Sequence, residues 1–296
     1  MTNRAVSEVL GFILVFALVT TTMSFVYVSD LASLEERRDA ERIDNAERAF
    51  DVLADNVEDI YRRDAPSRAT EIRLAEARLR LADSTEITIS VVNGSNVTVS
   101  GSTLEADDGS GNTLETNDGR IRYSSGTYLT HRSPLVTAVY TASPRPIEYA
   151  ADGSRIVYEN GAVIRADAGS AIMKRTPSMH FAKTDTVVRL IETRPSARDG
   201  SRSVGGTTTA LVRMERDKTA VLTPLVDQSP FFVNLTVRTT PARAATWERY
   251  LDARIGWTNP GTDSDPCDVS GDTVYCAFLV KERFEVVKAG IETTID

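Results

Sequence analysis

Two cysteines near the C-terminus form the residue pair whose spacing points most directly to a covalent bond. Cys267 and Cys276 lie in the segment D-P-C-D-V-S-G-D-T-V-Y-C, with Ser270-Gly271-Asp272 between them. A turn at these three residues would bring the cysteines together as a hairpin, and an oxidising environment would then allow a disulfide. Closing so short a loop contributes about 2–3 kcal/mol in the chain-entropy model. Structural zinc needs four ligands, so two cysteines alone predict no metal site.

Three Asn-x-Ser/Thr sequences make Asn93, Asn96 and Asn234 potential N-glycosylation sites. Asn93 and Asn96 flank an expected loop, whereas Asn234 lies inside an expected strand. The first two are therefore the better acceptors, because an acceptor asparagine belongs on an exposed loop.

Catalytic motifs are missing from the sequence. The chain has two histidines, His131 and His180, and no G-x-S-x-G elbow surrounds a serine. No H-E-x-x-H, phosphate-binding loop or dinucleotide fingerprint follows an expected strand. His131 is interpreted as a polar loop residue and His180 as a strand or edge residue. We therefore predict a protein that is not an enzyme and that has no cofactor.

The N-terminal segment has the composition of a membrane span. Arg4 precedes an apolar run of roughly 20 residues, long enough to cross the ~30 Å hydrocarbon core of a bilayer. We expect a transmembrane helix over residues 6–29. Acidic residues follow the run and Arg4 precedes it, which predicts a cytoplasmic N-terminus and an extracellular remainder. Glu8 is the ionisable residue within the run, so it is either a functional position or a residue at the headgroup boundary.

The order Arg4-Ala5-Val6-Ser7-Glu8-Val9-Leu10-Gly11 resembles the class III signal of archaeal type IV pilins, in particular those of haloarchaea. The resemblance implies that a prepilin peptidase removes residues 1–5 as a short cytoplasmic leader, between Ala5 and Val6. It also implies that Glu8 and Gly11 belong to a helix that packs against other pilin subunits. Many haloarchaeal pilins have Pro where this chain has Glu8. Bacterial pilins carry a Glu at the fifth mature position, but Glu8 would be fifth only if the cut fell before Arg4, so no role is transferred to that carboxylate.

A second resemblance covers more of the chain. The order I-E-Y-x-x-D-G-S-R-I-V-Y-E-N-G-A-V at residues 147–163, followed later by Trp247-x-x-Tyr250-Leu251, is similar to an uncharacterised group of haloarchaeal membrane proteins with pilin-like N-termini. It implies no catalytic activity.

An amphipathic helical extension is expected over residues 30–64. Apolar residues recur there at steps of three and four, and Asp64-Ala65-Pro66 should end the helix. A coiled-coil stalk is the alternative, although the stripe lacks a sustained heptad. The stripe consists of Leu31, Leu34, Ile43, Ala46, Phe50, Leu53, Val57, Ile60 and Tyr61.

From residue 67 to 296 the apolar period is mainly two, which predicts a β-rich extracellular head. Residues 71–82 are interpreted as strands, with a short helix as the alternative. Asn160-Gly161 predicts a tight hairpin, and residues 100–125 and 195–208 are interpreted as loops. Residues 242–255 predict a helix that starts after Pro241 and buries Trp247. The fold class expected is α+β: a long N-terminal helix, membrane-spanning and then amphipathic, with a mainly antiparallel β head.

The charge balance argues against nucleic acid as a partner. Lys and Arg total 34 against 42 Asp and Glu, giving a net charge of -8, and no basic cluster is present. Low lysine content and an acidic balance are also typical of salt-adapted proteins. We expect a structural or minor pilin-like subunit of a surface filament, with its head outside the cell. The alternative is a single-pass membrane-anchored protein that binds a ligand through its head and does not polymerise.

Overall fold

The computed structural model describes residues 3–93, 97–100, 103–106, 113–117, 119–123, 125–167, 169–182, 184–197, 202–222, 230–255 and 266–296. The chain divides into two compact units, residues 1–45 and 46–296, called here the N-terminal unit and the C-terminal unit. The helix α1, Asn3–Arg62, begins in the first unit and ends in the second.

Within the C-terminal unit, the last part of α1 is amphipathic. Phe50, Leu53, Val57 and Ile60 are fully buried at the helical spacing expected of one apolar stripe. The polar side of this segment is held by charges from strand β12, since Arg175 lies 2.7 Å from Asp55 and 3.0 Å from Glu58.

Sheet A has five strands in the order β1-β16-β20-β14-β13. Its β14 and β20 run parallel, with Asp185 opposite Arg283, and the remaining pairs of the sheet are antiparallel. The strand bounds are β1 Ser67–Arg73, β13 His180–Phe181, β14 Asp185–Pro195, β16 Thr209–Leu222 and β20 Arg283–Ile295.

Sheet B is antiparallel, with the strand order β12-β11-β10-β9-β2-β15. One of its hairpins turns at Asn160 and Gly161, whose φ angles of 47° and 86° are those of a primed turn. The strand bounds are β2 Ala77–Leu81, β9 Ile147–Ala151, β10 Ser154–Glu159, β11 Ala162–Asp167, β12 Ser170–Arg175 and β15 Ser203–Gly206.

Sheets C and D are the two that build the site described below. Sheet C has the order β18-β19-β17-β3-β8 and sheet D the order β4-β5-β6-β7, both antiparallel. The bounds in sheet C are β3 Glu86–Asn93, β8 Val136–Ala142, β17 Phe231–Arg238, β18 Cys267–Ser270 and β19 Thr273–Val280. Those in sheet D are β4 Val97–Ser100, β5 Thr103–Ala106, β6 Thr113–Asn117 and β7 Arg120–Tyr123.

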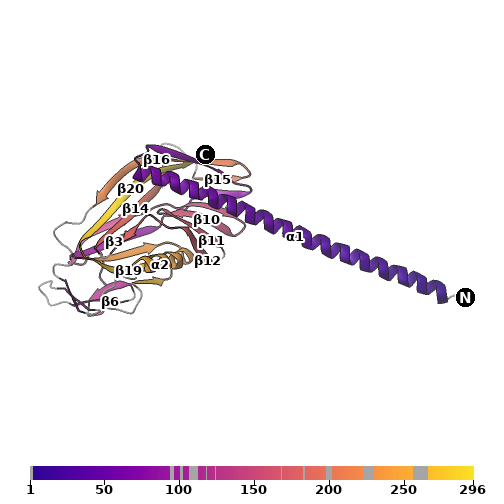
Figure 1. Cartoon of the computed structure of the whole chain (residues 1–296), viewed down its shortest axis with the longest axis horizontal. Helices are drawn as coiled ribbons and strands as arrows, with labels where there is room; N and C mark the ends of the chain where they lie inside the picture. Colours follow the sequence, from indigo (N-terminus) through magenta and orange to yellow (C-terminus); the bar gives the residue numbers. More distant parts are fainter. Residues whose placement is uncertain are drawn as a thin grey trace. The chain divides into compact units, whose positions relative to one another are not determined.

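The helix α2, Pro241–Ile255, packs beside β12 and β19 (Figure 1). Its Trp247 is fully buried and meets the Tyr250 ring edge-on at 6.0 Å. The Thr246 hydroxyl donates to the Ala171 carbonyl oxygen at 2.9 Å, and the Tyr250 hydroxyl donates to that of Pro177 at 3.2 Å. These contacts fix α2 over a core that includes the inner face of sheet C.

The predicted α+β fold class with a membrane-spanning first helix is wrong on two counts. The described part of the chain is mostly β, with 20 strands and two helices. No helix among the described residues is long and apolar enough to cross a membrane. The apolar stretch whose side chains are described, residues 10–25, is 16 residues long. At 1.5 Å per residue this is about 24 Å of helix, shorter than the ~30 Å hydrocarbon core.

Two predicted loops also contain strands. Residues 100–125 include β5, β6 and β7, and residues 195–208 include β15. Both segments are rich in polar and small residues, so they lack the clear alternation of apolar and polar residues that predicts a strand. By contrast, the Asn160-Gly161 hairpin, the strands within residues 71–82 and the helix after Pro241 are confirmed.

Candidate functional site

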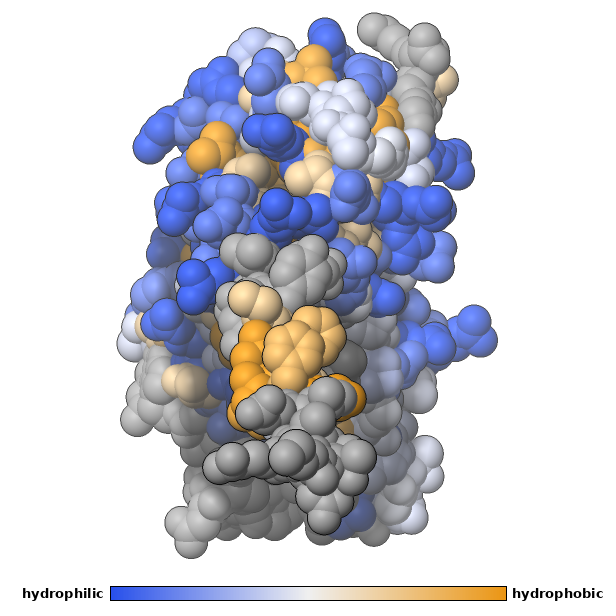
Figure 2. Space-filling view, turned by 90° about the vertical axis from the view of Figure 1, so that its right-hand side faces the viewer, coloured by the Kyte–Doolittle hydropathy of each residue, from blue (hydrophilic) through white to orange (hydrophobic). Residues whose placement is uncertain are grey.

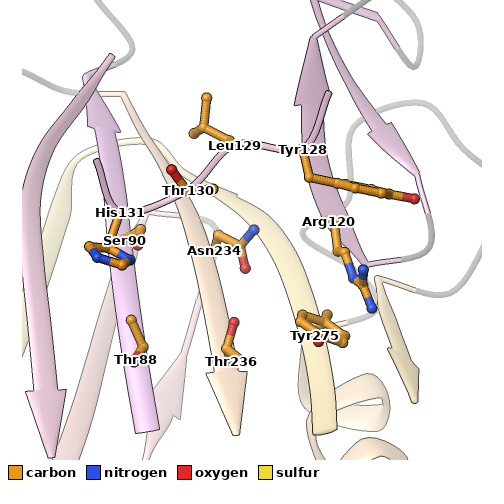
Figure 3. A pocket seen from close by; sticks show the side chains of 10 residues that line it. All are labelled: Thr88, Ser90, Arg120, Tyr128, Leu129, Thr130, His131, Asn234, Thr236 and Tyr275. Atoms are coloured by element: carbon orange, nitrogen blue, oxygen red, sulfur yellow. The ribbon is translucent and has the colours of Figure 1, made fainter. Parts of the chain in front are cut away.

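A cavity of about 290 Å³ lies on the outer face of sheet C. Figure 3 shows its lining side chains in three groups, which come from opposite sides of the cavity and from its floor. Tyr128, Arg120 and Tyr275 lie on one side, and His131, Ser90 and Thr88 lie on the other. Asn234 and Thr236 lie between them, and Leu129 and Thr130 complete the lining.

The floor of the cavity follows from the period of two in strands β3 and β17. Ile87, Ile89 and Leu235 are buried in the core, so Thr88, Ser90, Asn234 and Thr236, which alternate with such residues, face outward. In β17 Asn234 pairs with Ser90, and Thr236 pairs with Thr88. The sheet therefore presents two adjacent pairs of hydrogen-bonding side chains to the cavity.

The charged side of the cavity is a stack of one guanidinium and two tyrosine rings. The Arg120 Cζ lies 3.5 Å from the centre of the Tyr275 ring and 5.0 Å from that of Tyr128. Both distances are within the range of cation–π attraction. A guanidinium that stacks on an aromatic ring keeps its in-plane N–H groups for other partners.

Gly119 is what allows β7 to come this close to sheet C. A Cβ atom at this position would lie 2.1 Å from the Tyr275 carbonyl oxygen and 2.8 Å from the Asp268 backbone nitrogen. The Gly119 φ angle of 63° also lies in the left-handed region that favours glycine. Arg120 follows directly, so the glycine places the guanidinium over the Tyr275 ring.

A short connection after β7 carries Tyr128 and His131. The Tyr123 amide donates to the Thr127 carbonyl oxygen, and the Leu129 amide donates to that of Ile121, both at 2.8 Å. The Ser133 hydroxyl then accepts a hydrogen bond from the Thr130 amide at 3.0 Å, which closes the turn holding His131. Backbone pairing with β7 thus positions Tyr128 against Arg120.

Two buried polar atoms of the cavity have no hydrogen-bond partner among the described residues: the Nε of Arg120 and the Oδ1 of Asn234. A buried polar atom without a partner costs about 1–3 kcal/mol. Such atoms point to a ligand or to solvent as the missing partner.

The disulfide between Cys267 and Cys276 is confirmed. The two residues are directly paired across the β18–β19 hairpin, with their Cα atoms 4.1 Å apart. The turn is made by Gly271 and Asp272, within the segment that predicted it. Because Cys276 follows Tyr275, the bond also fixes the strand that forms one wall of the cavity.

Of the three potential glycosylation sites, Asn234 is the one whose side chain the structure describes. Asn93 is the last residue of β3, and its side chain is not among those described; Asn96 lies outside the described residues. Asn234 is partly buried in the middle of β17, where it lines the cavity. A strand between two paired neighbours is a poor place for a bulky glycan.

The two histidines lie apart from each other. His131 lines the cavity, whereas His180 is exposed in β13, with its Nε2 3.3 Å from the Asp185 Oδ2. Within the described ranges, no group of three or more His, Cys, Asp or Glu side chains could hold a metal ion.

The residues singled out at the N-terminus lie in α1. Ala5, Val6 and Glu8 belong to its first turns, where side chains are not described. Gly11 is the second residue of the described apolar stretch, and a Cβ there would meet nothing within 4 Å. Figure 2 shows a group of hydrophobic side chains, coloured orange.

In residues 10–25 the exposed apolar side chains lie on all sides of the helix, because successive residues of an α-helix point about 100° apart. The large apolar side chains that are exposed here are Leu10, Phe12, Ile13, Leu14, Val15, Phe16, Leu18, Val19, Met23 and Phe25.

Comparison with known proteins identifies the family. The sequence matches a family of unknown function, DUF7289, over residues 4–134 and 113–294. The chain belongs to the DUF7289 family. No curated protein matches the chain. No solved structure matches it either. The matched ranges include nearly all of α1 and the residues that line the cavity.

Sequence reasoning missed Arg120, Tyr128 and Tyr275 as a set. The loop expected over residues 100–125 contains strand β7, which carries Arg120. Asp118-Gly119 followed by Ile121 and Tyr123 is a hairpin signal that could have revealed this strand. No sequence signal joins β7 to Tyr275, because the two are 150 residues apart.

Proposed function

We propose that this DUF7289 protein is a pilin-like subunit of an extracellular filament, as a structural or accessory component. The observation that carries the proposal is the apolar stretch of α1, in which Phe12, Phe16 and Phe25 are 72%, 64% and 75% exposed. A helix that is apolar on all sides is stable only when other apolar surface covers it. The same stretch in other copies of the chain could bury this surface, and helices packed in this way would form the core of a filament.

The disulfide supports an extracellular site of action for the C-terminal unit. Disulfides persist in oxidising compartments and are reduced in most cytosols. The resemblance of residues 4–11 to a class III signal adds that a prepilin peptidase would cut between Ala5 and Val6. The new N-terminus would then be the start of the assembly helix.

A second candidate function is a surface binding protein that does not polymerise. The cavity on sheet C favours it, because a filament subunit needs no cavity with unpartnered polar atoms. The two candidates differ in what α1 does and agree that the C-terminal unit works outside the cell.

The mass and N-terminal sequence of the protein isolated from its native cells test the first proposal. A chain that starts at Val6 is the expected result. A mature protein that still starts at Met1 or Thr2 would exclude processing by a prepilin peptidase and with it the pilin-like assignment. An Ala5→Asp variant, which alters the cleavage position but not the apolar stretch, should accumulate uncut.

A further inference from the structure

The cavity on sheet C has the charge of a site for an anion. Among its described lining residues Arg120 is a cation and none is an acid. The whole chain carries a net charge of -8, so a cavity without carboxylates differs from the rest of the protein. No acidic side chain among the described residues forms an ion pair with Arg120, although ion pairs with other arginines are frequent. Within the described ranges, no carboxylate neutralises this positive charge.

The geometry of Arg120 suits a carboxylate. The Tyr275 and Tyr128 rings, with centres 3.5 Å and 5.0 Å from the Arg120 Cζ, hold the guanidinium in place by cation–π attraction. The N–H groups that remain lie in its plane and form a fork that matches the two oxygens of a carboxylate. The Nε of Arg120 has no hydrogen-bond partner among the described residues.

The floor of the cavity and the side opposite Arg120 are suited to hydroxyl groups. Ser90, Thr88, Thr130 and Thr236 each offer a hydroxyl, which can donate or accept. The Asn234 amide offers both a donor and an acceptor, and rotation about its last torsion exchanges the two. A ligand with several hydroxyls would satisfy this wall better than a simple anion would.

Size and shape add a third constraint. A volume of about 290 Å³ is at the lower end of the ~300–1,000 Å³ range of small-molecule sites. Tyr128 is 36% exposed at the edge of the cavity, so part of its ring is free for apolar contact. The C–H face of a sugar ring is apolar and packs on aromatic rings, while its rim of hydroxyls needs hydrogen bonds.

We propose that this cavity binds an acidic sugar, a hydroxylated ring that carries a carboxylate. Arg120 binds the carboxylate, the Asn234 amide and the Thr236 and Ser90 hydroxyls bind the ring hydroxyls, and Tyr128 contacts the C–H face. This function is independent of filament assembly, since it needs the C-terminal unit and not the apolar stretch of α1. Free sugar acids and the residues of an acidic polysaccharide present the same chemistry to the cavity.

Calorimetric titration of the full-length protein, kept in solution with a mild detergent, tests the proposal. The probes are glucuronate, glucose and acetate, which separate the carboxylated sugar from its neutral analogue and from a carboxylate alone. Glucuronate should bind at least tenfold more tightly than either of the others, because only glucuronate uses both walls of the cavity. Equal binding of glucose and glucuronate, or no binding of glucuronate, would overturn the proposal.

Two variants locate the site. Arg120→Gln should weaken glucuronate binding at least tenfold and remove the preference over glucose. Asn234→Asp is nearly isosteric and places a negative charge beside the ligand, so it should also weaken glucuronate binding. Arg254→Gln is the matched control, since Arg254 also lies over a tyrosine ring, 5.9 Å from the centre of Tyr250, but outside the cavity. Unchanged glucuronate affinity in a folded Asn234→Asp variant would contradict the assignment even if Arg120→Gln did not fold.

A polymer of glucuronate residues, compared at equal concentration of sugar residues, distinguishes the two sources of the ligand. Tighter binding of the polymer indicates a polysaccharide surface. Equal binding indicates recognition of a single sugar.

Discussion

Glu159 and Arg243 form an ion pair in the interior of the C-terminal unit, with 3.0 Å between Oε2 and the Nη1 atom. The Glu159 side chain is fully buried and that of Arg243 is 8% exposed. The two atoms are not aligned as a hydrogen bond, so the contact is mainly electrostatic. Glu159 ends β10, and Arg243 lies in the first turn of α2, where a cation is unfavourable for the helix dipole. The pair therefore joins sheet B to the start of this helix.

Removal of Glu159 should destabilise the protein strongly. Glu159→Ala leaves the Arg243 charge buried without its partner, which costs about 3–5 kcal/mol. It also removes the acceptor of the Thr85 hydroxyl, 2.6 Å from Oε1. Urea unfolding measures the change in the free energy of unfolding.

The exposed pair Arg194–Asp217 is the matched control for this measurement. Its side chains are 44% and 38% exposed, so Asp217→Ala should cost less than about 1 kcal/mol. A double variant, Glu159→Met with Arg243→Met, should recover much of the loss, because no buried charge is left. A double variant as unstable as Glu159→Ala would show that the ion pair is not the cause.

The Tyr250 hydroxyl should ionise far above the usual range. Burial raises its pKa to about 12 from a model-compound value of 10.0. A group whose pKa is higher in the folded state stabilises the protein below the unfolded pKa, and this contribution is lost as the pH rises toward the folded value. The free energy of unfolding should therefore fall between about pH 10 and pH 12. Tyr250→Phe should show a smaller fall over the same pH range, and identical slopes for both proteins would refute the assignment.

Gly119→Ala should separate β7 from sheet C. The new Cβ would meet the Tyr275 carbonyl oxygen, and the left-handed backbone would be strained as well. Strain and clash together predict a loss of about 2–5 kcal/mol in the free energy of unfolding. Gly126→Ala is the control, because its φ angle is 88° but a Cβ there would meet nothing within 4 Å. Its cost should be about 1–2 kcal/mol from strain alone. Equal losses in the two variants would mean that close approach at Gly119 does not matter.

The Cys267–Cys276 bond should stabilise the β18–β19 hairpin. Replacing both cysteines by alanine removes the constraint on the unfolded chain, at a cost of about 2–3 kcal/mol. Thermal unfolding with and without dithiothreitol gives the comparison. The reductant should lower the melting temperature of the native protein and leave that of the double variant unchanged. A reductant effect of similar size on both proteins would rule out the disulfide as its target.

Local signals in the sequence predicted the elements that are built from local contacts. The Asn160-Gly161 turn, the cysteine hairpin and the helix after Pro241 each depend on residues within about one element of each other. Trp247 and Leu251 lie four residues apart, and both are fully buried in α2. The period of two likewise revealed the strands whose alternate residues enter the core.

The cavity could not be predicted because its parts meet only through the tertiary fold. Arg120, Asn234 and Tyr275 come from strands β7, β17 and β19, and no pattern along the chain joins them. The sequence did not predict sheet D because its strands are short and polar. Its described buried side chains are Leu114 and Ile121. The predicted membrane span is wrong for another reason. The prediction counts the hydropathy of residues 6–29, whereas the described apolar stretch covers residues 10–25.

If the protein is a filament subunit, the apolar stretch of α1 packs against the same stretch of other copies. A photo-activatable phenylalanine analogue placed at Phe12, in the native cells, tests it directly. Ile172 in β12 is a matched control position, since its side chain is 61% exposed but lies outside the stretch. Illumination should give a ladder of cross-linked copies for the Phe12 position in the filaments sheared from the cells, and little or none for Ile172. Cross-links from Phe12 to unrelated molecules only, with no product that contains two copies of the chain, would contradict assembly through α1.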